Sequence, residues 1–107
     1  MVPAVLLLSA SVSVAPNEGL VSAEIMSIEP SSVIGAPSLL LVRIISSQDV
    51  GDLTNFTRDK IGQSIDLHTK EDVGALKPGH LIQARVRSAG GRRGSLFWAI
   101  DVNRIEK

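Results

Sequence analysis

Residues 80–102 read HLIQARVRSAGGRRGSLFWAIDV, and this stretch decides the fold that the sequence predicts. Two segments of alternating apolar and polar residues, 80–87 and 95–102, flank a glycine-rich linker at 88–94. Alternation with a period of two is typical of a half-buried β-strand, and two such strands around a short glycine-rich loop indicate a β-hairpin. The sequence therefore predicts an antiparallel hairpin with a flexible tip.

The same alternation predicts which side chains each strand of the hairpin buries. The apolar set of the first strand is Ile82, Ala84 and Val86. Burial of this apolar set leaves Arg85 and Arg87 on the outer face, because neighbouring residues of a strand point to opposite sides. The larger apolar set of the second strand is Leu96, Trp98, Ile100 and Val102. We therefore expect Trp98 in the core and Phe97 on the outer face, beside the two arginines.

Three more strands are expected earlier in the chain, at residues 20–28, 39–45 and 64–69. Each is short, apolar on alternate positions or throughout, and bounded by turn-forming residues. Residues 30–37 form a loop with two prolines, and Lys77-Pro78-Gly79 is a turn that starts the next strand. Residues 46–62 leave two interpretations open, a short helical turn capped by Asp52 or a long loop.

The first fifteen residues, MVPAVLLLSASVSVA, carry no charged side chain. An apolar centre at residues 4–8 is typical of a secretory signal, but the basic residues that precede such a centre are missing. Residues 8–14 alternate between apolar side chains and serine, which indicates a strand or ordered arm. Both interpretations of residues 1–15 stay open, a strand or arm of the fold and a signal remnant. Residues 16–107 are expected to form a single domain.

Several kinds of chemistry are excluded by what the sequence lacks. There is no cysteine, which rules out disulfides and cysteine-ligated zinc. We expect His68 to be exposed on a polar strand face and His80 to pair with loop backbone, so no metal site and no cofactor is predicted. Neither a Gly-x-Ser-x-Gly motif nor a phosphate-binding glycine motif occurs. We therefore expect a binding module and not an enzyme.

The run from Leu76 to Glu106, LKPGHLIQARVR…GSLFWAIDVNRIE, resembles the closing hairpin of oligonucleotide/oligosaccharide-binding (OB) domains. In that family a Lys-Pro-Gly turn leads into an alternating strand that pairs with a final, aromatic-bearing strand. The resemblance implies an all-β, five-stranded antiparallel barrel, with a sixth strand if the N-terminal arm joins it. OB barrels usually carry a helix between their third and fourth strands, where only residues 71–76 are available here. An SH3-like or other small barrel is therefore the competing interpretation.

The resemblance also implies where a ligand would bind, namely at the hairpin loop and the neighbouring strand face. Residues 78–107 hold six basic residues against two acidic ones, whereas residues 1–42 hold three glutamates and no basic residue. Local positive charge attracts a phosphate backbone, and an exposed aromatic ring can stack on a base. The predicted ligand-binding residues are Arg85, Arg87, Arg92, Arg93 and Phe97.

Two main functions remain open at this stage, beside a third, weaker alternative of an exported or surface domain that binds carbohydrate. The first is a non-catalytic OB-like module that binds single-stranded nucleic acid through the hairpin 85–97. The second is a protein-interaction or assembly module, in which residues 1–15 pack on a partner protein or a second copy of the chain. No apolar run approaches the roughly 20 residues of a transmembrane helix. A cytoplasmic location is favoured. Export is the alternative, because Asn55-Phe56-Thr57 fits the N-glycosylation acceptor pattern.

Overall fold

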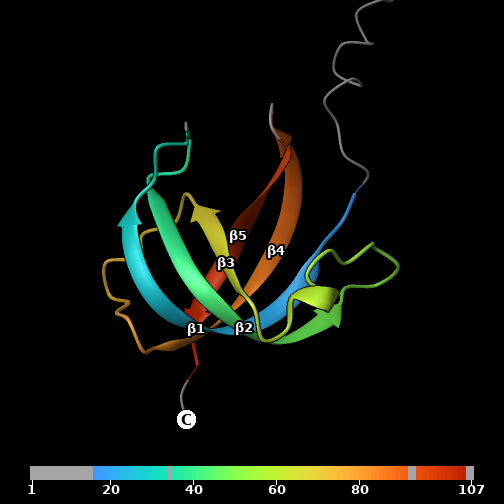
Figure 1. Ribbon diagram of the computed structural model, residues 1–107, viewed down its shortest axis with the longest axis horizontal. Helices are drawn as coiled ribbons and strands as arrows, with labels where there is room; N and C mark the ends of the chain where they lie inside the picture. Colours follow the sequence, from blue (N-terminus) through green and yellow to red (C-terminus); the bar gives the residue numbers. More distant parts are fainter. Residues whose placement is uncertain (1–15, 34, 92–93, 106–107) are drawn as a thin grey trace, which may run out of the picture.

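The computed structural model describes residues 16–33, 35–91 and 94–105 of the chain. Residues 1–15, on which the predicted arm or signal falls, lie outside this description. Five strands form one sheet: β1 (Gly19–Pro30), β2 (Ser38–Asp49), β3 (Ser64–Thr69), β4 (Leu81–Gly91) and β5 (Gly94–Arg104). The sheet closes into a ring in the order β1-β2-β3-β5-β4, and Figure 1 shows the curved strands around a single interior. The prediction of an all-β domain with five strands is confirmed.

The sheet is mixed, which corrects the prediction of a wholly antiparallel arrangement. Four neighbouring pairs are antiparallel, but β3 and β5 run parallel, with Leu67 opposite Phe97 and His68 opposite Trp98. The reason is geometric. A closed ring of five strands cannot alternate direction all the way round, so at least one neighbouring pair must be parallel. The β4–β5 hairpin places that pair at β3 and β5, because β5 lies between β3 and β4.

The interior of the ring is filled with aliphatic side chains. Alternate residues of β1, β3 and β4 reach the core, and the inward face predicted for β4, with Ile82, Ala84 and Val86, is confirmed. β2 contributes Leu40, Val42 and Ile44, while Ile45 on its outer side is 41% exposed. The buried core residues are Val21, Ala23, Ile25, Leu40, Val42, Ile44, Leu67, Val73, Ile82, Ala84, Val86 and Ala99.

The predicted faces of β5 are wrong from Leu96 to Ile100. Residues directly opposite each other in a hairpin share a face, and Ala99 lies opposite the buried Val86. Ala99 and Phe97 therefore point inward, and Trp98 points outward opposite Arg87. The sequence did not separate the two faces, because β5 is apolar at both sets of alternate positions.

The alternation changes at Asp101, which has a positive φ of 54°. The pairing register with β4 shifts close to this residue, and Val102 returns to the core. An aspartate tolerates this left-handed backbone better than a β-branched residue does. The irregularity behaves as a β-bulge, in which one extra residue on β5 changes which alternate positions face the core.

The connection between β2 and β3 is a loop that carries one 3-10 turn, η1 (Arg58–Lys60). A helical turn capped by Asp52 does not form, because η1 begins after Thr57 and has no side-chain cap. Asn55 holds the loop in place. Its amide nitrogen donates to Ser47 Oγ (2.8 Å) and Asp49 Oδ1 (3.2 Å), so the nitrogen of the candidate glycosylation acceptor is already engaged in the fold.

The turn predicted at Lys77-Pro78-Gly79 is confirmed. Gly79 has a φ of 93°, and the amide of His80 donates to the Lys77 carbonyl at 3.1 Å. The turn also pairs with β1, since the Gly79 amide donates to the Ile25 carbonyl and the Ile25 amide to the His80 carbonyl. His80 Nδ1 accepts a hydrogen bond from the Lys77 amide, as predicted for a histidine paired with loop backbone.

Candidate ligand-binding surface

The two arginines of β4 lie on the outer face of the ring, as predicted. Ala84 and Val86 point into the core, which turns Arg85 and Arg87 outward. Their cross-strand partners on β5 are Ile100 and Trp98, respectively. The structure therefore brings Arg87 next to an aromatic residue, which is Trp98 and not Phe97, whereas Arg85 lies opposite Ile100.

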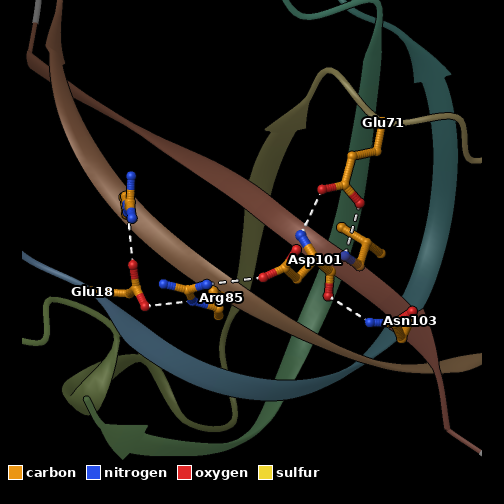
Figure 2. Close-up of polar contacts among 7 residues, drawn as sticks. Glu18, Glu71, Arg85, Asp101 and Asn103 are labelled. Atoms are coloured by element: carbon orange, nitrogen blue, oxygen red, sulfur yellow. Dashed lines mark hydrogen bonds and ion pairs between the residues drawn. The ribbon is translucent and has the colours of Figure 1, made fainter. Parts of the chain in front are cut away.

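Both guanidinium groups bind one buried carboxylate. Glu18, whose side chain is 1% exposed, accepts from Nε of Arg85 at 2.6 Å and from Nε of Arg87 at 2.7 Å. Arg85 donates a further bond from Nη1 to Asp101 at 2.9 Å (Figure 2). The hydrogen bond from Arg85 is the main cause that lowers the pKa of Glu18, against the opposing effect of burial. Glu18 is thus held ionised, as a buried carboxylate with two cationic partners should be.

Asn17 fixes the position of Glu18 at the start of β1. Its side-chain amide donates to the Ser88 carbonyl at 2.9 Å, and its side-chain oxygen accepts from the Ser88 amide at 2.7 Å. This pair of bonds imitates one step of a strand ladder and ties the chain entering β1 to β4. The backbone of Glu18 donates to the Thr54 carbonyl. The carboxylate therefore projects from a segment that is anchored on two sides.

Trp98 sits in the middle of a row of side chains that crosses the outer face of four strands. Leu39 of β2 lies opposite His68 of β3, His68 opposite Trp98 of β5, and Trp98 opposite Arg87 of β4. The rings of His68 and Trp98 are 5.9 Å apart and tilted by 48°. The row places the indole of Trp98 between the imidazole of His68 and the cationic side chain of Arg87.

His68 is buried, at 8% exposed, which corrects the expectation of an exposed side chain. Trp98 lies against its ring, and Nδ1 pairs with Ser31 Oγ at 3.1 Å in the β1–β2 loop. Ser31 Oγ also accepts from the Val33 amide. His68 therefore packs beside Trp98 and connects it to that loop.

A pocket of about 500 Å³ opens beside Trp98. It is lined by Lys70, Glu71, Arg87, Ala89, Trp98, Ala99 and Ile100. The Glu71 carboxylate is committed to the fold, since it accepts from the backbone amides of Asp101 (2.6 Å) and Val102 (2.9 Å), as Figure 2 shows. Lys70 and Arg87 thus provide positive charge next to an aromatic ring. We refer to this place as the Trp98 pocket.

Phe97 lines a different pocket, at one end of the ring interior. Its volume is about 460 Å³, and its wall includes Phe56, Arg58 and Lys60 of the β2–β3 connection. The guanidinium of Arg58 is paired with Asp49 at 2.5 Å. Phe97 is therefore separated from Arg85 and Arg87 by the thickness of the sheet, and the predicted five-residue site does not form as one surface.

The remaining predicted site residues, Arg92 and Arg93, lie outside the described residues. Sequence reasoning missed three side chains that the structure brings to the arginines: Glu18, Lys70 and Trp98. Trp98 could have been found from the hairpin register, since Val86 opposite Ala99 forces it outward. Glu18 had no such signal, because it is 67 residues away from Arg85.

Comparison of the chain with protein-family models, with curated proteins and with solved structures gave no match. In the described part of the chain, no helix has the length and apolar character needed to cross a bilayer.

Proposed function

We propose that this chain is an OB-type barrel that binds single-stranded nucleic acid at the Trp98 pocket and does no catalysis. The observation that carries the proposal is the position of Trp98, on the outer face between a buried histidine and an arginine. Proteins that bind single strands combine aromatic rings, on which bases stack, with cations that follow the backbone. Trp98 provides the ring and Lys70 provides a cation, while Arg87 lies beside them with its charge paired to Glu18.

The strand order supports the OB assignment. A five-stranded ring in which β5 returns between β3 and β4 is a Greek-key arrangement, as in OB barrels. OB domains bind through the face of their second and third strands and through the loops after the first and fourth strands. The row from Leu39 to Arg87 extends across that face, and Ser31 brings the loop after β1 next to it. The connection from β3 to β4 carries no helix in its described residues 70–80, unlike the usual OB barrel.

The charge of the surface indicates modest, not strong, attraction to phosphate. Arg85 and Arg87 face Glu18 and Asp101, so these four side chains have no formal net charge. Stacking on Trp98 must then contribute much of the affinity, at about 1–3 kcal/mol per base. If two to four cations, including Arg92 and Arg93, contact phosphate, the logarithm of the affinity should fall with the logarithm of salt with a slope of about −1.4 to −2.8.

Fluorescence anisotropy with a labelled oligonucleotide of about 16 nucleotides, the upper site size of one OB domain, tests the proposal. Single-stranded DNA and RNA should bind and a duplex of the same sequence should bind more weakly. Trp98→Ala should weaken binding by about tenfold or more, as expected for one lost stacking contact. Phe97→Leu is the matched control, because Phe97 points to the other side of the same strand. Equal losses for both variants would contradict the proposal.

A second candidate function, protein interaction, is favoured by the β2–β3 connection. Leu53, Phe56 and Ile61 are 37%, 43% and 51% exposed, and all three lie within this one loop. Exposed apolar side chains gathered in one place mark contact surfaces more often than scattered ones do. Leu53→Ser with Ile61→Ser should dissociate a complex or oligomer of this kind in light scattering. The same double variant should leave oligonucleotide binding unchanged.

A further inference from the structure

We infer that Glu18 restrains nucleic-acid binding, because it holds the cationic side chains of Arg85 and Arg87 that would otherwise contact the phosphates of a strand stacked on Trp98. The inference rests on the proposed function and names a control over the same surface. Its residues come from two strands and the segment before a third: the arginines belong to β4, Trp98 and Asp101 to β5, and Glu18 directly precedes β1.

Carboxylates engage part of the donor set with which each arginine would bind phosphate. Arg85 is engaged twice, through Nε with Glu18 and through Nη1 with Asp101, as Figure 2 shows. Arg87 is engaged through Nε with the other carboxylate oxygen of Glu18. A guanidinium binds carboxylate and phosphate with the same fork of donors, so the bonds that Glu18 accepts are in competition with bonds to a phosphate.

Glu18 cannot easily move away to make room for a phosphate. Its side chain is 1% exposed, while those of Arg85 and Arg87 are 41% and 53% exposed. A buried carboxylate that lost both cationic partners would remain charged and desolvated, which is a costly state. The arginines therefore stay with Glu18, and a ligand meets a surface whose positive charge is largely neutralised.

The position of the arginines makes the restraint relevant to the Trp98 pocket. Arg87 lies directly opposite Trp98, and Arg85 lies opposite Ile100, which lines the same pocket. A backbone phosphate next to a base on Trp98 would therefore come close to both guanidinium groups. Removing the negative charge of Glu18 should convert these two side chains from a neutral cluster into phosphate ligands.

Two variants and one control test the inference by oligonucleotide affinity at about 50 and 200 mM salt, a range over which phosphate contacts make the affinity fall measurably. Glu18→Gln should raise affinity about tenfold at the lower salt and steepen the salt slope by about 0.7–1.4, as one or two added phosphate contacts would. Asp101→Asn releases only Nη1 of Arg85 and should steepen the slope by at most about 0.7. Asparagine tolerates the positive φ of this position, so this variant keeps the test valid if Glu18→Gln fails to fold.

The matched control is Glu24→Gln. Glu24 of β1 forms an ion pair with Arg43 of β2, with 2.9 Å between Oε1 and Nη2. Glu24→Gln changes the net charge by the same amount as Glu18→Gln, but outside the Trp98 pocket. Its affinity should stay close to that of the unmodified chain. The inference is overturned if Glu24→Gln tightens binding as much as the other two, or if neither Glu18→Gln nor Asp101→Asn tightens it.

Trp98→Ala distinguishes a failure of the inference about Glu18 from a failure of the proposed function. If Trp98→Ala weakens binding while Glu18→Gln and Asp101→Asn leave affinity and slope unchanged, the proposed function stands and the restraint by Glu18 is wrong. If the unmodified chain and all of these variants fail to bind single strands, both are wrong. A purely structural role for Glu18 would lower stability without raising affinity, so the gain in binding is the decisive readout.

Discussion

His68 and Trp98 face each other across the one parallel strand pair of the ring, with their ring centres 5.9 Å apart. The side chain of His68 is 8% exposed, and its Nδ1 is paired with Ser31 Oγ. The orientation of Trp98 therefore depends on a buried neighbour and, through it, on the loop after β1. Pairs of this kind contribute about 0.5–1.5 kcal/mol beyond the area that they bury.

His68→Ala should loosen Trp98 and shift its emission to longer wavelength, because the indole loses the ring that shields it from water. Oligonucleotide affinity should fall several-fold with it. The measurement is the emission spectrum of the folded protein without ligand. His80→Ala is the control, since His80 bonds to the Lys77 amide in the turn before β4. An unchanged spectrum in His68→Ala would show that His68 does not position Trp98.

Glu71→Ala should destabilise the domain by about 1–3 kcal/mol, the cost of leaving hydrogen-bonding groups unsatisfied. The Glu71 carboxylate accepts hydrogen bonds from the amides of Asp101 and Val102 at the bulge of β5. Urea unfolding measures the change. Asp72→Asn is the neighbouring control, because Asp72 accepts only a local bond from Gly74 in an exposed turn. Equal stability of Glu71→Ala and the unmodified chain would contradict this role.

Gly19→Ala should destabilise the domain by about 1–3 kcal/mol through overpacking. An added Cβ would overlap the side-chain oxygen of Asn55 and lie 2.7 Å from Thr57 Oγ1, both of which are held in a hydrogen-bonded loop. Thermal unfolding measures the loss. Gly74→Ala is the control, since its Cβ would meet only the end of the Asp72 side chain, at 3.1 Å. A loss in Gly74→Ala as large as that in Gly19→Ala would rule out this steric explanation.

The stability of the domain should decrease in acid, partly because of Glu18. Its pKa is lower in the folded chain than the ordinary value of 4.5, so the unfolded chain binds the proton more readily. The stabilisation is therefore fully present above about pH 4.5 and is lost as the pH falls toward the folded pKa. Asp49, whose pKa is lowered by its hydrogen bond to Arg58, adds a change of the same sign.

Urea unfolding of Glu18→Gln at several pH values checks this dependence. The variant should be less stable than the unmodified chain at pH 7, and the difference should shrink below pH 4.5. The shrinking follows because the protonated Glu18 of the unmodified chain resembles the neutral glutamine. A difference that stays constant down to pH 3 would exclude Glu18 as a source of the acid sensitivity.

The sequence predicted the strands well because their signal is local. The alternation at Ile82, Ala84 and Val86 and the turn at Gly79 both appear in the structure where they were expected. Alternation could not predict which face of β5 points inward, because the successive residues Phe97 and Trp98 are both apolar. Their sides are decided by the pairing of Ala99 with Val86 on another strand.

The candidate site was less predictable than the fold, because it is assembled from distant parts of the chain. Arg85 and Arg87 could be placed outside from the pattern of their own strand. Their partner Glu18 comes from the start of β1, and local alternation carries no information about that contact. His68 shares its strand face with Asp66 and Lys70, yet it is buried, with Trp98 brought beside it by the parallel pairing.

The most direct test of the account is the quenching of Trp98 fluorescence by a single-stranded oligonucleotide. Trp98 is the sole tryptophan of the chain, so its emission reports on one side chain. The account predicts saturable quenching, with the same dissociation constant that anisotropy gives for the labelled strand. An oligonucleotide that binds by anisotropy but leaves the emission of Trp98 unchanged, or that does not bind at all, would contradict it.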